Sequence, residues 1–245
     1  MVKHCLAILL AILFSYTLQA QSYTDSLSAS SKVEMKEQYD FTGDFQLNIF
    51  STDKEGNKRL DGHFRYYYHQ KFKERLGIRP LGLKPEESVF TILENGNMIT
   101  LDAKTKTAIL LSYEQFEKEL ENQASSSAKK ELSASFAKTG NKKSINGFQC
   151  EEYLAEDSES RTIAWFTNEI SFDITSVFHS LGMDLNMPAN FPKGLMMILI
   201  HYDKRRNTFS EMNVSDVNPQ KKTTIETKGY KPMSFSDLMK EGEGN

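Results

Sequence analysis

The residue types that most often carry chemistry are few and scattered in this chain of 245 residues. Cys150 is the cysteine expected to remain in the mature protein, because Cys5 lies in an N-terminal segment that is expected to be removed. A reactive thiolate needs a histidine or a cation beside it, whereas the sequence neighbours are Glu151 and Glu152, which disfavour it. We therefore expect Cys150 to be a buried, inert side chain, with an intermolecular disulfide as the alternative.

The histidines show no pair at the spacing that places two metal ligands on one side of a strand or helix. Those in the expected mature chain are His63, His69, His179 and His201. The sequence also lacks an HExxH motif, a G-x-S-x-G nucleophile elbow, a phosphate-binding loop and a dinucleotide fingerprint. We therefore expect no enzyme activity, no metal ion and no cofactor.

The first twenty residues, MVKHCLAILLAILFSYTLQA, have the order of a cleaved signal peptide. Lys3 precedes an apolar run that ends at Phe14, and Ala20 is a suitable last residue before cleavage. The alternative is a membrane anchor, but the run is shorter than the roughly 20 apolar residues that a span needs. Cys5 lies before the cleavage point, so a lipid attached there would be lost. We expect a soluble periplasmic or secreted protein without a stable membrane anchor.

The charge balance argues against nucleic acid as a partner. The chain carries 30 Lys and Arg against 33 Asp and Glu, a net charge of −3, whereas nucleic-acid binding needs a basic surface. Residues 21–245 have a suitable length for one domain with its own core. The segment around residues 121–138 is rich in Ser and Lys and poor in bulky apolar residues, so we expect a mobile connection there.

Strand patterns dominate the rest of the chain. Aromatic and β-branched residues recur in short runs between turn residues, which is typical of strands. Asn95-Gly96 and Asn146-Gly147 predict two-residue hairpin turns, because these residues tolerate the positive φ angles such turns require. A third turn is expected at Asp203–Asn207. Connections this short favour antiparallel pairing of consecutive strands.

Helix patterns follow Ser112, which can cap a helix together with Gln115, and begin again at Phe172. The strand LMMILIHY, residues 195–202, is apolar on both faces, so both faces need cover. We expect a mainly β (α+β) fold: a curved antiparallel sheet, or unclosed half-barrel, with two or three helices covering its concave side.

Three consecutive tyrosines, Tyr66, Tyr67 and Tyr68, lie in one of the expected strands. Because side chains alternate along a strand, the outer two share a face and the middle one points the other way. We expect them to anchor a core or an interface; stacking on a sugar is the alternative.

The segments KTGNKKSINGFQCEEY, TIAWFTNEI and LMMILIHYDKRRNTFSEMNVSDV resemble a family of secreted Gram-negative envelope proteins classed as a domain of unknown function, DUF4412. The residues that carry the resemblance are Lys138 to Gly140, Ile145, Gly147, Phe148, Cys150, Tyr153, Trp165, Asp203 and Lys204. Phe148 stands where tyrosine is more usual. The resemblance implies a fold similar to the periplasmic lipoprotein carriers LolA and LolB, with helices around an apolar cavity, and it implies no catalytic residues. Its expected structural residues are Gly147, Phe148, Cys150, Tyr153 and Trp165.

Large apolar residues, including several methionines, concentrate late in the chain. Methionine is flexible and polarizable, so such a cluster can line a pocket for acyl chains, or it can fill an ordinary core. The candidate cavity residues are Phe178, Leu181, Met183, Met187, Phe191, Leu195, Met197 and Leu199. The loop of residues 182–194 contains two prolines and is a candidate lid.

These observations predict a non-catalytic protein that binds a lipid, or the acyl chains of a lipoprotein, between its sheet and its helices. The alternative is an envelope module whose core is closed by its own side chains and whose surface binds a protein partner.

Overall fold

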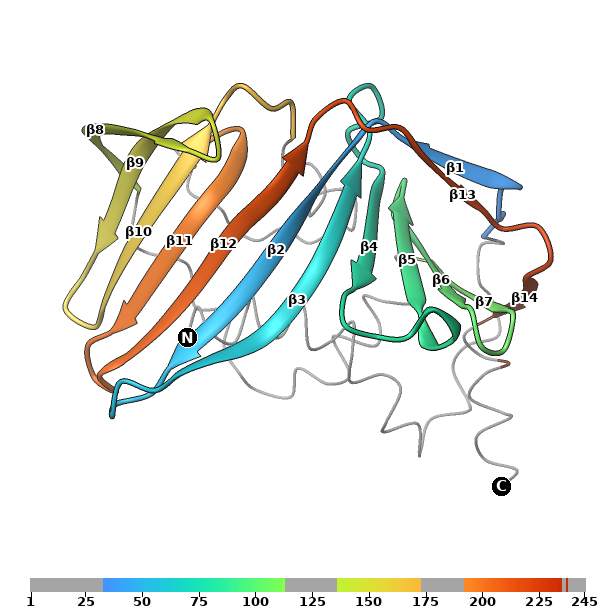
Figure 1. Ribbon diagram of the computed structural model, residues 1–245, viewed down its shortest axis with the longest axis horizontal. Helices are drawn as coiled ribbons and strands as arrows, with labels where there is room; N and C mark the ends of the chain where they lie inside the picture. The colour runs from blue at the N-terminus through green and yellow to red at the C-terminus, as the bar shows by residue number, and fades with distance from the viewer. Residues whose placement is uncertain (1–32, 113–135, 173–191, 235–236, 238–245) are drawn as a thin grey trace.

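A computed structural model describes residues 33–112, 136–172, 192–234 and 237, and its described part is almost entirely β-structure (Figure 1). The strands of the first half are β1 (Gln38–Phe41), β2 (Gly43–Thr52), β3 (Lys58–Tyr68), β4 (Leu76–Pro80), β5 (Val89–Glu94), β6 (Asn97–Asp102) and β7 (Thr107–Ser112). Those of the second half are β8 (Ala137–Ile145), β9 (Phe148–Glu156), β10 (Ser160–Thr167), β11 (Leu195–Asp203), β12 (Thr208–Asn218), β13 (Thr223–Glu226) and β14 (Lys231–Ser234). A 3₁₀ turn, η1 (Pro85–Glu87), precedes β5.

Twelve of these strands form one sheet in the order β14-β7-β6-β5-β4-β3-β2-β12-β11-β10-β9-β8, while β1 pairs with β13. Antiparallel pairing is confirmed for every neighbouring pair except β14 and β7, which are parallel. That exception corrects the fully antiparallel expectation. It arises because the chain reaches β14 by way of β12 and β13 rather than by a hairpin, and Lys231 N–H then donates to Lys106 O at 2.8 Å.

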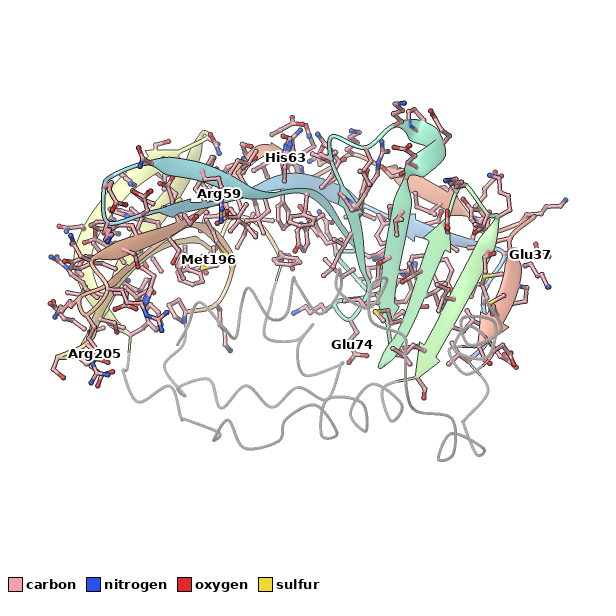
Figure 2. All side chains as sticks on the ribbon, turned by 90° about the horizontal axis from the view of Figure 1, so that it is seen from below. Glu37, Arg59, His63, Glu74, Met196 and Arg205 are labelled. Atoms are coloured by element: carbon pink, nitrogen blue, oxygen red, sulfur yellow. The ribbon has the colours of Figure 1, made fainter. Side chains whose placement is uncertain are left out.

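The large sheet is curved and not closed. Figure 2 shows its two ends, β5 to β7 on one side and β8 to β10 on the other, turning toward the same side of the molecule. The edge strands β14 and β8 are not paired with each other. The expected unclosed, mainly β sheet is therefore confirmed. The helices expected after Ser112 and from Phe172 fall in residues 113–135 and 173–191, outside the described residues, and the described part offers no helix other than η1 to cover the sheet.

The expected turns are present. Asn95 and Gly96 have φ angles of 50° and 74°, and Asn146 and Gly147 have φ angles of 52° and 87°, as a two-residue turn between antiparallel strands requires. Residues 204–207 form the turn between β11 and β12. Most of the segment for which a mobile connection is expected lies outside the described residues; at its end Phe136 is buried and β8 begins at Ala137.

Alternation along β2 and β3 gives the sheet two different faces. Phe45 and Leu47 lie directly beside Tyr66 and Phe64 on the apolar face, which we call the inner face. His63 points the opposite way and lies on the convex side in Figure 2, so the inner face is concave. The tyrosine expectation is confirmed: Tyr66 and Tyr68 join the inner core, and Tyr67 joins a second core on the other face.

The second core lies where the β1–β13 pair covers the outer face of β4 to β7. Phe41 packs on Tyr67 with ring centroids 5.8 Å apart, and Tyr67 packs on Phe90 at 5.2 Å. Gly77 lies among these rings, since a Cβ atom there would meet Phe90 at 2.7 Å and Phe41 at 3.0 Å. A side chain at this position would separate the two layers.

An ion group joins β1 to the large sheet at the rim of this second core. Glu94 accepts from Arg75 Nε at 2.6 Å and pairs with Lys36 Nζ at 2.5 Å, while Arg75 Nη1 donates to Asp40 O at 3.0 Å. Both Arg75 and Glu94 are largely buried. The group therefore fixes the small pair of strands to β4 and β5 through charge as well as through aromatic packing.

Candidate functional site

The candidate site is the inner face of the curved sheet, because it carries one continuous apolar surface across many strands. Neighbouring strands place Val214, Leu47 and Phe64 side by side, and Tyr68, Leu76 and Leu93 form another row. The buried members between β12 and β5 are Phe45, Phe64, Tyr66, Tyr68, Leu76, Ile78, Leu93 and Val214. Large apolar residues at alternate positions of neighbouring strands place their side chains on one face of the sheet. That face is stable when other parts of the chain, or an apolar partner, shield it from water.

An aromatic cluster forms the centre of this face. Phe45 stacks on Tyr66 with centroids 5.4 Å apart, and Phe172 meets Phe45 edge-on at 5.3 Å and Tyr68 at 5.6 Å. Phe172 lies shortly after the strand β10 and the buried Ile170, so the chain turns from the end of β10 onto the inner face here. Stacked and edge-on ring pairs stabilise the core by more than the burial of their apolar area alone.

The hydroxyl of Tyr68 is the one polar atom in the described part of this cluster that is buried without a hydrogen-bond partner. The ring lies directly over Gly43, where a Cβ atom would meet Tyr68 Cζ at 2.4 Å and its hydroxyl at 2.6 Å. Burial, with the negative charge of Asp44, raises the pKa of Tyr68 to about 12. Burial also raises the pKa of Tyr66. Both phenols therefore stay protonated and neutral over the physiological range.

The candidate cavity residues are only partly within the described chain. Phe178, Leu181, Met183, Met187 and Phe191 lie outside the described residues, as does most of the candidate lid of residues 182–194. Leu195 and Met197 are buried in the inner core together with Trp165. Their place in a ligand cavity remains a prediction.

Leu199 lies apart from Leu195 and Met197, although simple alternation would put all three on one face. The reason is a bulge: Trp165 pairs with Ile198 and Phe166 with Met196, so Met197 is the extra residue of β11. Leu199 therefore pairs with Ala164 and packs into a separate small cluster. That cluster contains Phe136, Ala155, Ala164 and Phe166, with Tyr153, Met196 and Leu199 against it.

The hairpin of β8 and β9 carries the sequence motif and closes the end of the inner core. Asn146 Nδ2, at its tip, donates to Val214 O of β12 at 2.7 Å. Cys150 is buried, and burial raises the pKa of its thiol. Lys143 lies opposite Cys150, a cationic neighbour that sequence order alone did not suggest, but its ammonium sits 4.0 Å from the centre of the Trp165 ring. The thiol is therefore not activated.

We expect Cys150→Ala to lower the free energy of unfolding by only about 1 kcal/mol, since it removes one small buried group. Ligand binding should be unchanged, because no step of binding needs the thiol. Urea unfolding and a lipid-binding assay on the same preparation check both parts. Loss of binding in a folded Cys150→Ala protein would contradict an inert role.

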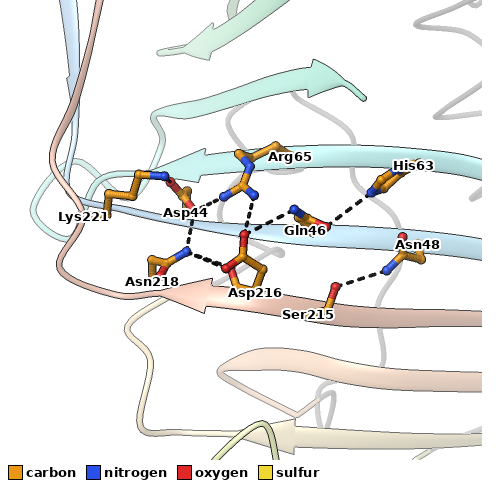
Figure 3. Close-up of polar contacts among 9 residues, drawn as sticks. All are labelled: Asp44, Gln46, Asn48, His63, Arg65, Ser215, Asp216, Asn218 and Lys221. Atoms are coloured by element: carbon orange, nitrogen blue, oxygen red, sulfur yellow. Dashed lines mark hydrogen bonds and ion pairs between the residues drawn. The ribbon is translucent and has the colours of Figure 1, made fainter. Parts of the chain in front are cut away.

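A polar cluster on the outer face, drawn in Figure 3, connects β12, β2 and β3. Asp44 is fully buried and accepts from Arg65 Nη1 at 2.6 Å and from Asn218 Nδ2 at 3.1 Å. Arg65 also pairs with Asp216, whose hydrogen-bond partner Gln46 in turn contacts His63. These groups pair mainly with one another, so the cluster holds three strands together rather than presenting open ligand positions.

Within the residues described, no group of three or more His, Cys, Asp or Glu side chains is arranged to hold a metal ion. The described segments also contain no helix with the length and apolar character needed to cross a membrane.

The model of one protein family, described as "Domain of unknown function (DUF4412)", matches residues 41–184. The comparison with curated proteins finds no match. Among solved structures, an uncharacterized conserved protein from Thermus thermophilus is 6% identical with a TM-score of 0.41, over 79% of this chain and 91% of that one. A LolA superfamily protein from Nitrosomonas europaea is 10% identical with a TM-score of 0.30, over 74% and 87%. MucB in complex with MucA(peri) is 6% identical with a TM-score of 0.38, over 72% of this chain and 50% of that one.

Proposed function

The chain belongs to the DUF4412 family, and we propose that it is a non-catalytic binding protein whose inner sheet face takes up the acyl chains of a lipid or a lipoprotein. The observation that carries the proposal is the continuous layer of buried apolar side chains from β12 to β5 on the concave side of an open sheet. Removing a methylene from water there contributes roughly 0.8 kcal/mol, so burying about ten acyl carbons contributes about 8 kcal/mol, from which the entropic cost of binding is subtracted.

The proposed place of this function is the bacterial envelope. The N-terminal segment has the order of a signal peptide, and an acyl chain that crosses an aqueous compartment needs a protein to shield it from water. Binding of this kind needs no reacting group, which agrees with the inert state of Cys150 and the neutral state of the buried phenols.

Trp165 offers a direct test, because it is the chain's single tryptophan and packs in the inner core. Acyl chains that carry bromine quench tryptophan fluorescence on close approach. A brominated diacyl phospholipid and a brominated triacyl lipopeptide, each titrated separately, should quench Trp165 saturably, and the tighter of the two identifies the source of the chains. If neither quenches and the protein captures neither lipid, the alternative of a protein-binding module with a closed core replaces this proposal.

A pair of neighbouring substitutions separates the two faces. Ile49 and Phe50 are adjacent on β2, both half-buried, and point to opposite sides, with Ile49 packed against the inner core. We expect Ile49→Lys to weaken acyl-chain binding at least about tenfold, because it places a charge where apolar carbons should lie. Phe50→Lys, the control, should bind like the wild type. Equal loss in both variants, measured by the same quenching titration, would mean that the inner face is not the binding surface.

A further inference from the structure

We infer that the ligand presents a neutral carbonyl group, that of an acyl ester or amide, to the hydroxyl of Tyr68. The inference rests on the proposed function and adds to it a polar recognition point beside the apolar surface. Tyr68 would then fix how deep and in which orientation the acyl chain lies.

The first argument is the missing partner of this hydroxyl. Tyr68 is 2% exposed, and no group in the described part of the chain accepts from its hydroxyl. Buried polar atoms are nearly always hydrogen-bonded, and a buried donor without a partner destabilises the folded protein. An unpaired hydroxyl inside an apolar binding face is suited to donate a hydrogen bond to an acceptor atom of the ligand.

The second argument is its position. The ring of Tyr68 lies over Gly43 on the inner face and contacts the rings of Phe45 and Phe172. Gly43 is the β2 partner of Tyr68, so the hydroxyl lies on the β2 side of β3, whereas Leu76 and Leu93 continue the apolar row on the other side. A carbonyl at the hydroxyl with its acyl carbons against the rings of Phe45 and Phe172 would satisfy both kinds of surface with one molecule.

The third argument concerns charge and selects a neutral acceptor. The proton stays on the phenol, so Tyr68 acts as a donor, and the ligand must accept. The negative charge of Asp44 acts on this hydroxyl. The cations Arg65 and Lys221 are already paired with the Asp44 carboxylate. A ligand carboxylate would bring a second buried negative charge beside the first, whereas an ester or amide carbonyl would not.

Three ligands of equal chain length test the inference: hexadecane, methyl hexadecanoate and hexadecanoate, each delivered from cyclodextrin. The wild type should bind the ester about tenfold more tightly than the alkane, and the carboxylate no better than the alkane. In Tyr68→Phe the preference for the ester should disappear while alkane binding stays. The same variant should unfold about 3 °C higher when empty, because the unpaired donor is gone.

Tyr67→Phe is the matched control, since it removes a hydroxyl from the second core on the other face. It should keep the ester preference. Equal binding of ester and alkane by the wild type, or an ester preference that survives in Tyr68→Phe, would overturn the inference and leave the proposed function standing. Failure of all three ligands to bind would overturn the proposed function itself, and the inference with it.

Discussion

Asp44→Asn is expected to lower the free energy of unfolding by about 3 kcal/mol, a large fraction of the stability of an ordinary domain. The side chain of Asp44 is 0% exposed, and its Oδ1 accepts from Arg65 and Asn218. The Lys221 ammonium lies 3.1 Å from Oδ2, although this contact is not aligned as a hydrogen bond. The amide removes the negative charge that balances Arg65 and Lys221. The largely buried Arg65 then keeps only Asp216 as an anionic partner.

Asp216→Asn is the matched control, because Asp216 pairs with the same Arg65 while its side chain is 50% exposed. Asparagine also tolerates the positive φ of 46° at this position. Solvent already weakens this pair, so we expect a cost below about 1 kcal/mol. Urea unfolding of the three proteins at neutral pH gives both values. Equal costs at the two positions would show that burial of Asp44 contributes nothing to the strength of the cluster.

The hairpin turns, and the placement of the three consecutive tyrosines on opposite faces of β3, were predictable from sequence because each depends only on neighbouring residues. Asn95-Gly96 needs only its own two φ angles, and alternation alone separates Tyr67 from Tyr66 and Tyr68. These features need no knowledge of which distant strands pair.

The remaining features depend on pairing between distant segments, which periodicity does not encode. The bulge at Met197 moves Leu199 into another cluster, and no residue type near it marks the position. Asp44 appears in the sequence as an ordinary polar residue of a half-exposed strand, and only β12 and β3 make it a buried ion-pair centre. The parallel pairing of β14 likewise follows from where the chain returns, not from its composition.

Glu94 should make stability depend on pH in acid. Burial disfavours its charge, but hydrogen bonds from Lys36 and Arg75 outweigh that effect and lower the pKa of Glu94 below its ordinary value. A carboxyl whose pKa is lower in the folded protein than in the unfolded chain binds fewer protons when folded. The contribution of Glu94 to the free energy of unfolding is therefore complete above the pKa of the unfolded chain, about 4.3. It is lost as the pH falls through the pKa of the folded protein.

Glu94→Gln should accordingly lower the free energy of unfolding at neutral pH by about 2–3 kcal/mol, because Arg75 keeps its charge at a site where its side chain is only 9% exposed. Below about pH 4 the difference from wild type should narrow, since the wild-type carboxyl then becomes protonated as well. Glu37→Gln, at an exposed position next to Lys36, is the control and should change the free energy of unfolding only slightly. Adding Arg75→Met to Glu94→Gln should recover part of the loss, because it removes the unpaired charge and keeps the packing on Phe72. Thermal and urea unfolding between about pH 3 and 7 give the stability of all four proteins. If the free energy of unfolding of Glu94→Gln stays below that of the wild type by a constant amount down to about pH 3, the ion group does not fix β1 to the sheet through charge.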